Sequence, residues 1–199
     1  MKQSDNTSWA LDIIFVHSGE HNRNASTMGT PTAQPIYAST TYLHQNAEAL
    51  DEAFDRTSSS AEGEEAYVYA RQGNPNAHAL ETVMARAEGG VGAVAFGSGM
   101  AAIHAALMAA GIAPGSKIVA SKDLYGATIS LLRKVFIPLG IEVVLHDLCC
   151  PGAADIIRAE QPDVVYVETL SNPLVKVIDL DAISSAAQEV GAVSVVDST

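Results

Sequence analysis

The sequence is poor in cysteine and in basic residues. Its 199 residues include two cysteines, and these two, Cys149 and Cys150, are neighbours. Neighbouring cysteines rarely bridge, so the sequence offers no disulfide framework. Lys and Arg number 11 against 23 Asp and Glu, which gives a formal net charge of −12. This excess of carboxylates repels a phosphate backbone, and no basic patch offsets it, so the composition argues against nucleic-acid binding.

Signals for export, membrane insertion and metal binding are also missing. Residues 1–10 are polar and lack the basic and apolar regions of a signal peptide. No apolar run reaches the roughly 18 residues that cross a bilayer. The six histidines show no metal-ligand spacing. We therefore expect a cytoplasmic protein with no metal site and no membrane partner.

Residues 1–65 contain no long periodic segment. A polar stretch occupies 57–65, and seven acids against one base between 48 and 65 account for half of the net charge. Such charge runs are usually solvated. We therefore expect residues 1–65 to form an extended N-terminal arm with a polar insertion and one short helix near 47–54.

From Asn74 onward, short apolar segments alternate with segments of helical periodicity. Asn74 followed by Pro75 is a typical helix start, because Asn caps free amides and Pro at the first position loses nothing. Five buried strands separated by helices predict an α/β fold, with a mostly parallel sheet covered by helices on both faces. The expected helices are 75–87, 100–110, 127–139, 153–160 and 180–190, and the expected strands are 91–96, 117–121, 141–146, 163–168 and 192–197.

A glycine-rich turn, Gly97-Ser98-Gly99, lies between the first expected strand and the helix after it. Helix N-termini bind phosphate through unpaired amides and a positive dipole end. Two kinds of phosphate-bearing ligand are compatible with this turn, a dinucleotide and a smaller phosphorylated cofactor. The spacing from Gly97 to Ala102, with Asp123 further on, also fits a dinucleotide fingerprint, so an NAD-dependent oxidoreductase is the alternative interpretation.

Polar and aromatic residues follow the other expected strands. Tyr125 follows the second strand, Glu168 and Asn172 follow the fourth, and Asp197 ends the fifth. The carboxyl ends of parallel strands share one edge of a sheet, so we expect these residues to line one crevice. A phosphate cradle, an aromatic ring, an amide and a carboxylate together suit a phosphorylated aromatic cofactor with a basic ring nitrogen.

Five ordered motifs carry a resemblance to a known family. They are Y-V-Y-A-R-Q-G-N-P (67–75), G-S-G-M-A-A (97–102), D-L-Y-G-A-T (123–128), E-T-L-S-N-P (168–173) and V-V-D-S-T (195–199). Together they resemble the Cys/Met metabolism family of pyridoxal-phosphate-dependent trans-sulfuration enzymes. This family includes cystathionine γ-synthases and γ-lyases, methionine γ-lyases and O-acylhomoserine sulfhydrylases. The resemblance implies a truncated fold-type I large domain, with residues 66–199 as the N-terminal part of its pyridoxal-phosphate-binding domain.

The resemblance also implies roles for individual residues. The amides of Gly99 and Met100 would hold the cofactor phosphate, and Tyr125 would stack on the pyridine ring. Asp197 would pair with the ring nitrogen, and Asn172 would lie near the phenolic oxygen of the cofactor. In a homodimer or homotetramer, Tyr69 and Arg71 would reach the phosphate of the neighbouring subunit. Arg suits this task because its planar fork meets phosphate oxygens with two hydrogen bonds.

The implied reaction is elimination or replacement at the β or γ carbon of a sulfur-containing or O-acylated amino-acid substrate. Family members use one lysine for the resting Schiff base, and no lysine of this sequence stands in the matching context. We therefore expect an N-terminal fragment that is inactive by itself. A non-catalytic truncated paralogue is a further alternative. Ala127 stands where methionine γ-lyases have Cys, so that subtype is less favoured, and the form Y-G-A-T differs from the one expected of bacterial cystathionine β-lyases.

Overall fold

The computed structural model describes residues 10–17, 33–58 and 66–199. Within it the chain divides into two compact units, Met1–Ala95 and Phe96–Thr199. The expected boundary between residues 65 and 66 remains a prediction. The expected polar insertion lies mostly at 59–65, outside the described residues.

The first unit contains helices and extended chain. Residues 40–42 run antiparallel to 68–70, with the Tyr42 amide donating to Val68 O at 3.2 Å and the Ala70 amide donating to Thr40 O at 2.8 Å. Asn74 caps the third helix by accepting a hydrogen bond from the Asn76 amide at 2.8 Å. The helices of this unit are α1 (Leu11–His17), α2 (Ala47–Ser58) and α3 (Pro75–Ala87).

The predicted helices at 47–54 and 75–87 are confirmed as α2 and α3, although α2 extends to Ser58. Helix α1 was not predicted, because seven residues are too few to show a helical period. The expectation of an arm with a single helix was therefore wrong for residues 11–17. None of the described helices combines the length and the apolar character that crossing a bilayer requires.

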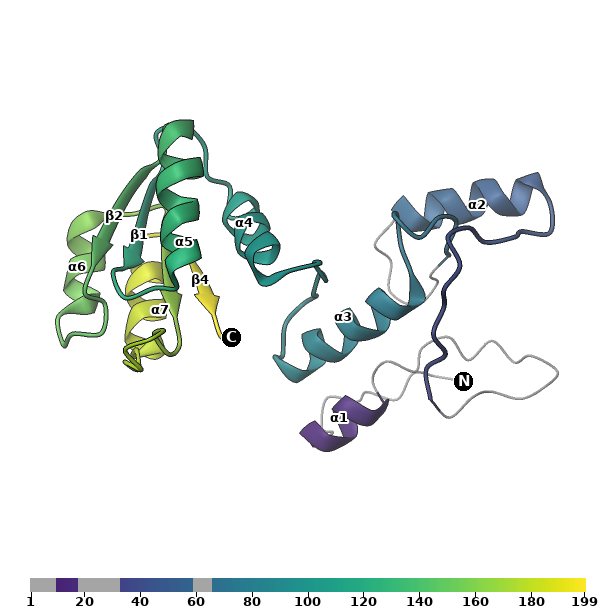
Figure 1. The fold of residues 1–199 in the computed structure, drawn as a ribbon, viewed down its shortest axis with the longest axis horizontal. Helices are drawn as coiled ribbons and strands as arrows, with labels where there is room; N and C mark the ends of the chain where they lie inside the picture. The colour runs from purple at the N-terminus through teal and green to yellow at the C-terminus, as the bar shows by residue number, and fades with distance from the viewer. Residues whose placement is uncertain (1–9, 18–32, 59–65) are drawn as a thin grey trace. The chain divides into compact units, whose positions relative to one another are not determined.

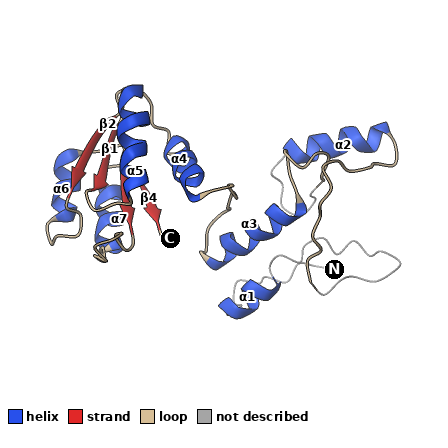
Figure 2. Cartoon of the chain, in the orientation of Figure 1, coloured by secondary structure: helices blue, strands red, loops and turns tan. Residues whose placement is uncertain are grey.

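The second unit is a four-stranded parallel sheet with helices on both faces (Figure 2). Its strand order is β2-β1-β3-β4, so β1 and β3 lie in the middle. The strands are β1 (Lys117–Ser121), β2 (Glu142–His146), β3 (Val164–Glu168) and β4 (Val193–Asp197). The α-helices are α4 (Gly99–Ala109), α5 (Gly126–Leu131), α6 (Ala153–Glu160) and α7 (Leu180–Glu189).

Side chains of the central strands alternate between two hydrophobic cores. On one face, Ile118, Val164 and Tyr166 pack with residues of α4 and of the α5 segment, such as Leu107 and Phe136. On the other face, Val119, Val165 and Val167 pack with α6 and α7. Burial on both sides explains why β3 is an apolar run from Val164 to Val167, with Tyr166 inside it and Glu168 at its end. The predicted α/β fold with a parallel sheet is confirmed.

The strand predicted at 91–96 is wrong. This segment forms no β ladder, and its valines Val91 and Val94 are 107% and 72% exposed. The Ala95 amide donates to the Glu81 carboxylate at 2.8 Å instead of to a neighbouring strand. A short apolar run indicates extended chain, but a strand also needs a partner backbone, and no local pattern can supply that. The other four predicted strands are confirmed as β1 to β4.

The helix predicted at 127–139 is present but irregular. It begins as α5, widens into the π-helix η1 (Leu132–Phe136) and closes as the 3₁₀-helix η2 (Ile137–Leu139). Leu132 and Phe136, at the two ends of the π-helical segment, are both fully buried. Gly140, with φ at +86°, ends the segment in a conformation that glycine adopts without steric cost.

An acid-sensitive ion-pair group links α6 to two strands. Glu160 Oε1 lies 2.9 Å from His146 Nε2, and Glu160 Oε2 lies 3.2 Å from Lys117 Nζ. These two partners, His146 first, hold the pKa of Glu160 below its ordinary value of 4.5. Its charge therefore stabilises the folded state fully above the pKa of the unfolded chain, and that contribution disappears as the pH falls through the lower folded value.

We expect Glu160→Gln to reduce the free energy of unfolding at pH 7, with a difference from the native chain that shrinks on acidification to pH 3. Urea unfolding at several pH values measures this. Glu142→Gln is the matched control, because Glu142 reaches Lys117 at 3.4 Å but is 59% exposed, so its effect should be smaller. A difference that stays constant or grows with acid would contradict the assignment.

Candidate active site

The N-terminus of α4 presents backbone amides to open space. Ser98 caps the helix by accepting from the Ala101 amide at 3.2 Å. Helical geometry gives the amides of Gly99 and Met100 no partner inside the helix. A Cβ atom added at Gly97 or Gly99 would meet nothing within 4 Å, so this turn leaves room for a group to approach the backbone closely. These features suit a phosphate.

Tyr125 is held by its backbone at the start of α5. Its amide donates to Glu168 Oε1, at the end of β3, at 2.7 Å. Glu168 is 8% exposed, whereas Tyr125 is 49% exposed. The carboxylate therefore fixes the loop between β1 and α5 and leaves the aromatic ring accessible to a ligand.

Asp197 ends β4 with both carboxylate oxygens hydrogen-bonded. Its Oδ2 accepts from the Tyr166 hydroxyl at 3.2 Å. Its Oδ1 accepts from the Thr199 amide at 3.1 Å and from the Thr199 hydroxyl at 2.7 Å. Three donors thus orient the carboxylate at the carboxyl edge of the sheet.

Asn172 lies in the loop after β3, which is closed by its own hydrogen bonds. The Ser171 amide donates to Lys176 O at 3.0 Å, and the Lys176 amide donates to Ser171 Oγ at 2.9 Å. Ser171 is buried, and the peptide bond from Asn172 to Pro173 is cis. Asn172 itself is exposed, so its amide is available at the surface of this loop.

Four charged residues, which we call the loop charge cluster, connect the loops after β1, β2 and β3. Lys176 Nζ lies 2.6 Å from Asp123 Oδ2 and 3.8 Å from Asp147 Oδ2, and Asp147 also pairs with Lys122 at 2.8 Å. The hydrogen bond from Lys122 lowers the pKa of Asp147, and the hydrogen bond to Asp123 raises the pKa of Lys176. Burial raises the pKa of the neighbouring Cys149 thiol, which argues against a reactive cysteine.

The sheet order brings these features to a topological switch point. The chain passes from β1 to β2 on one side and then returns to β3 on the other side of β1. Ligands of open α/β sheets bind outside the carboxyl ends of strands at such a point. Figure 1 shows the ends of β1 and β4 and the start of α5 at the same edge, and α4 packs against α5 and β4. The expectation that Met100, Tyr125, Asn172 and Asp197 line one crevice at this edge stays a prediction.

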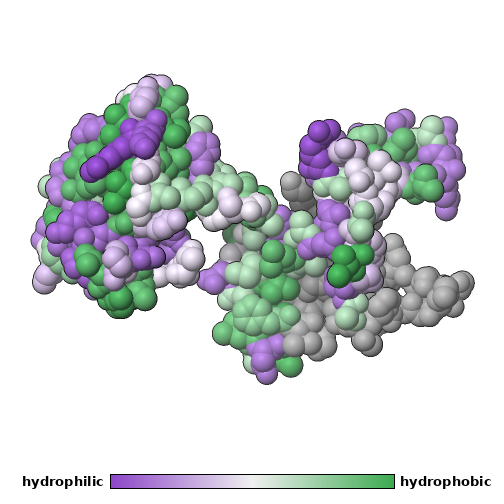
Figure 3. Space-filling view, viewed as in Figure 1, coloured by the Kyte–Doolittle hydropathy of each residue, from purple (hydrophilic) through white to green (hydrophobic). Residues whose placement is uncertain are grey.

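Hydrophobic surface lies beside this edge. Figure 3 shows hydrophobic residues gathered at the lower end of the second unit, near the start of α7. The loop after β3 contributes exposed apolar residues there, namely Leu170, Leu174, Val175 and Val177. An apolar rim next to a few convergent polar groups is the usual composition of a small-molecule site.

Tyr69 and Arg71 belong to the first unit. The Arg71 guanidinium carbon lies 5.0 Å from the centre of the Tyr69 ring, within the range of a cation–π contact. Arg71 is exposed and Tyr69 is half-buried. The two residues form one local pair, and their expected role toward a neighbouring subunit stays a prediction.

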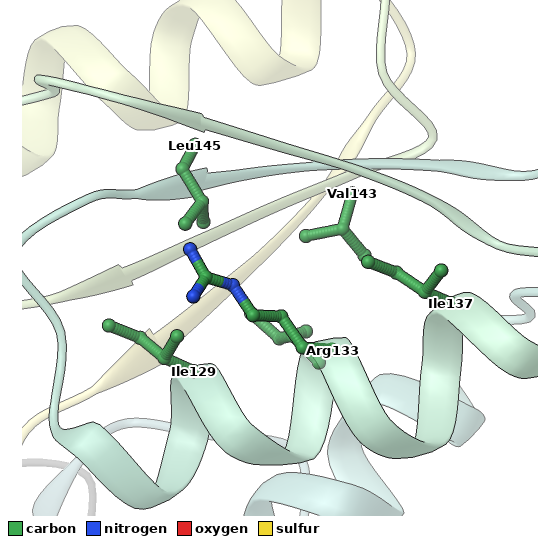
Figure 4. Close-up of a pocket in the computed structure, with 6 residues that line it drawn as sticks. Ile129, Arg133, Ile137, Val143 and Leu145 are labelled. Carbon is green, nitrogen blue, oxygen red and sulfur yellow. The ribbon is translucent and has the colours of Figure 1, made fainter.

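One cavity lies elsewhere, between the α5 segment and β2. It encloses about 240 Å³, and Figure 4 shows Arg133 extending among apolar side chains there. It has no second polar group to orient a phosphorylated ligand, and it lies along the sheet instead of at its carboxyl edge. Its lining residues are Ile129, Leu132, Arg133, Ile137, Val143 and Leu145.

The donor set at the carboxyl edge fits a phosphorylated pyridine. Amides at a helix start match the phosphate, an accessible ring matches the aromatic face, and an oriented carboxylate matches a protonated ring nitrogen. A dinucleotide fits less well, because its fingerprint requires a strand directly before the glycines, and residues 91–96 form none. In the part of the chain that the structure describes, no three potential ligand side chains gather as a metal site.

Comparison with known proteins decides the family. The sequence matches the family described as Cys/Met metabolism PLP-dependent enzyme over residues 12–199. The chain belongs to this family. The resemblance inferred from the five motifs is thereby confirmed, together with the pyridoxal-phosphate dependence of the family.

Relatives within the Cys/Met metabolism family have several named activities. The chain is 42% identical over 136 residues to a cystathionine β-lyase of Lactococcus lactis subsp. cremoris, covering 67% of this chain and 34% of that protein. It is 34% identical over 188 residues to an O-acetyl-L-homoserine sulfhydrylase of Leptospira meyeri, covering 94% and 40%. The departure at Y-G-A-T therefore does not separate this sequence from β-lyases.

Solved structures of the Cys/Met metabolism family share the fold. The metB structure from Corynebacterium glutamicum superposes with a TM-score of 0.79 at 30% identity, covering 98% of this chain and 46% of that chain. A putative O-acetylhomoserine (thiol)-lyase from Campylobacter jejuni, with a TM-score of 0.78 at 26% identity and coverage of 96% and 45%, contains a pyridoxyl-lysine phosphate. The chain thus spans less than half the length of these relatives. Neither the oxidoreductase nor the non-catalytic paralogue finds support here.

Sequence reasoning missed four residues of this edge as contributors. It placed Glu168 at a strand end without a role, and it did not single out Tyr166, Lys176 or Thr199. One of the four could have been found from the sequence. Tyr166 stands inside an apolar segment predicted to be a buried strand, and a buried tyrosine needs a hydrogen-bond partner for its hydroxyl.

Proposed function

We propose that this chain forms the cofactor-binding part of a pyridoxal-phosphate-dependent enzyme that eliminates or replaces a group at the β or γ carbon of sulfur-containing or O-acylated amino acids. The observation that carries the proposal is the hydrogen-bonded carboxylate of Asp197 at the end of β4, next to the end of β3 where Glu168 holds the Tyr125 amide, in a member of this family. When bound, pyridoxal phosphate supplies an electron sink for a carbanion at the substrate α-carbon.

Each residue has a defined task in this proposal. The amides of Gly99 and Met100 bind the phosphate, and the ring of Tyr125 covers one face of the pyridine. Asp197 holds the proton on the ring nitrogen, because an oriented carboxylate favours the positively charged form. Asn172 donates from its amide to the phenolic oxygen. Tyr69 and Arg71 reach the phosphate of the neighbouring subunit in a homodimer or homotetramer.

Three lysines of the described chain, Lys117, Lys122 and Lys176, are poor partners for an aldehyde, since an amine must be neutral to react. Lys117 and Lys176 are held charged, because Glu160 and Asp123 respectively raise their pKa. Lys122 is paired with Asp147 at 2.8 Å. We therefore propose that this chain binds the cofactor without a covalent bond and is inactive alone.

Equilibrium dialysis against pyridoxal phosphate tests the proposal directly. We expect saturable binding of one cofactor per chain and at least about tenfold weaker binding of pyridoxal, which lacks the phosphate that the α4 amides hold. NAD should bind no better than AMP. After borohydride reduction, mass spectrometry should find no stoichiometric pyridoxyl adduct on any lysine.

Two results would contradict the proposal in different ways. Equal affinities for pyridoxal and pyridoxal phosphate would show that the α4 amides do not bind the phosphate. A stoichiometric adduct on one lysine would leave the cofactor assignment in place but would show that this chain already contains the reactive amine.

A further inference from the structure

Tyr166 is a tyrosine in the most buried strand of the sheet. It lies in the middle of β3 between Val165 and Val167, and all three residues are 0% exposed. Its ring packs in the core formed with α4 and the α5 segment, among residues that include Leu132 and Phe136. A valine or isoleucine would fill such a position without a polar group to satisfy, so the hydroxyl calls for an explanation.

The hydroxyl of Tyr166 points to the end of the neighbouring strand. It donates to Asp197 Oδ2 at 3.2 Å, two positions beyond Val195, the register partner of Tyr166 on β4. The opposite carboxylate oxygen is held by Thr199 through its amide and its hydroxyl. Asp197 is therefore held at one oxygen by a residue of the core, Tyr166, and at the other oxygen by Thr199.

We propose that Tyr166 is a positioning residue for Asp197: with Thr199, its hydroxyl fixes the orientation of the carboxylate that holds the proton on the ring nitrogen of the cofactor. This inference rests on the proposed function. A hydrogen bond to an ionised group is stronger than one between neutral groups, so its loss can affect a neighbouring protonation equilibrium.

The environment of Tyr166 keeps its hydroxyl a donor. Burial, and then the charge of Asp197, raise the pKa of Tyr166 far above its ordinary value. The phenol is therefore protonated at neutral pH and can donate to the carboxylate.

The test uses the full chain with pyridoxal 5′-phosphate labelled with ¹⁵N at the ring nitrogen. Tyr166→Phe removes the hydroxyl and keeps the ring. We expect its dissociation constant for the cofactor to rise about tenfold, with 1.4 kcal/mol corresponding to each tenfold change. At a fixed pH of 7.5, the ¹⁵N resonance should move toward that of neutral pyridine. Tyr42→Phe, which removes a tyrosine hydroxyl in the other unit, should change neither value.

The outcomes separate this proposal from the proposed function. A native chain that binds no cofactor, or binds it with a neutral nitrogen, overturns both. A native chain that binds the protonated cofactor, with Tyr166→Phe unchanged in affinity and resonance, overturns the role of Tyr166 alone. If Tyr166→Phe does not fold, Thr199→Val removes another donor at an exposed position; a smaller shift in the same direction supports the proposal, and an unchanged resonance overturns it.

Discussion

Phe136→Ala should lower the free energy of unfolding by about 3–5 kcal/mol, the usual cost of emptying a fully buried phenylalanine position. Phe136 is 0% exposed and lies in the core between the sheet and the helices α4 and α5. Its ring also contacts His104 of α4 at a centroid distance of 5.5 Å. Urea unfolding followed by circular dichroism measures the change.

Val135→Ala is the matched control for this substitution. Val135 is the preceding residue of η1 and is 37% exposed, so its truncation should cost below about 1 kcal/mol. Comparable losses for the two variants would mean that the helical segment is not packed as described.

Asp197→Asn should weaken the binding of pyridoxal phosphate about 10- to 100-fold, the equivalent of one hydrogen bond between charged groups. The amide keeps the size of the side chain but removes the charge that holds the proton on the ring nitrogen. It also places an NH₂ group where Oδ1 or Oδ2 accepts hydrogen bonds from Thr199 and Tyr166. Equilibrium dialysis measures the affinity, and absorbance of the bound cofactor reports its protonation.

Asp155→Asn controls for the general loss of one negative charge. Asp155 lies in the first turn of α6, its side chain is 84% exposed, and it pairs with Arg158. This variant should bind the cofactor as the native chain does. Equal weakening in both variants would indicate a long-range charge effect and would remove the specific role of Asp197.

Much of the second unit could be predicted from its sequence, because each strand and helix there carries a local signal. The strand Lys117–Ser121 and the helix Ala153–Glu160 begin and end at the predicted residues. Whether residues 91–96 form a strand could not be predicted, since that depends on a partner backbone distant in sequence. Likewise, nothing in the period of 127–139 reveals the π-helical turn, which depends on how Leu132 and Phe136 fit the core.

The positions of Tyr125, Asn172 and Asp197 at or after the ends of strands could be predicted, because the strands themselves carry local signals. The contacts that position these residues could not be predicted, because they join segments that are distant in sequence. The Tyr125 amide reaches Glu168 across 43 positions, and Tyr166 reaches Asp197 across 31. Parallel strands bring such residues together, but only the sheet order determines which pairs meet.

The loop charge cluster makes the rim of this site more sensitive to added salt than the sheet beneath it. Two cations and two anions join the loops after β1, β2 and β3, and the side chain of Lys176 is 38% exposed. Attraction between solvent-exposed charges weakens over a Debye length of about 8 Å at physiological ionic strength, whereas buried apolar contacts are barely affected. Added salt should therefore weaken the exposed Lys122–Asp147 pair, whose side chains are 48% and 36% exposed, more than the Lys176–Asp123 pair, in which the Asp123 side chain is 13% exposed.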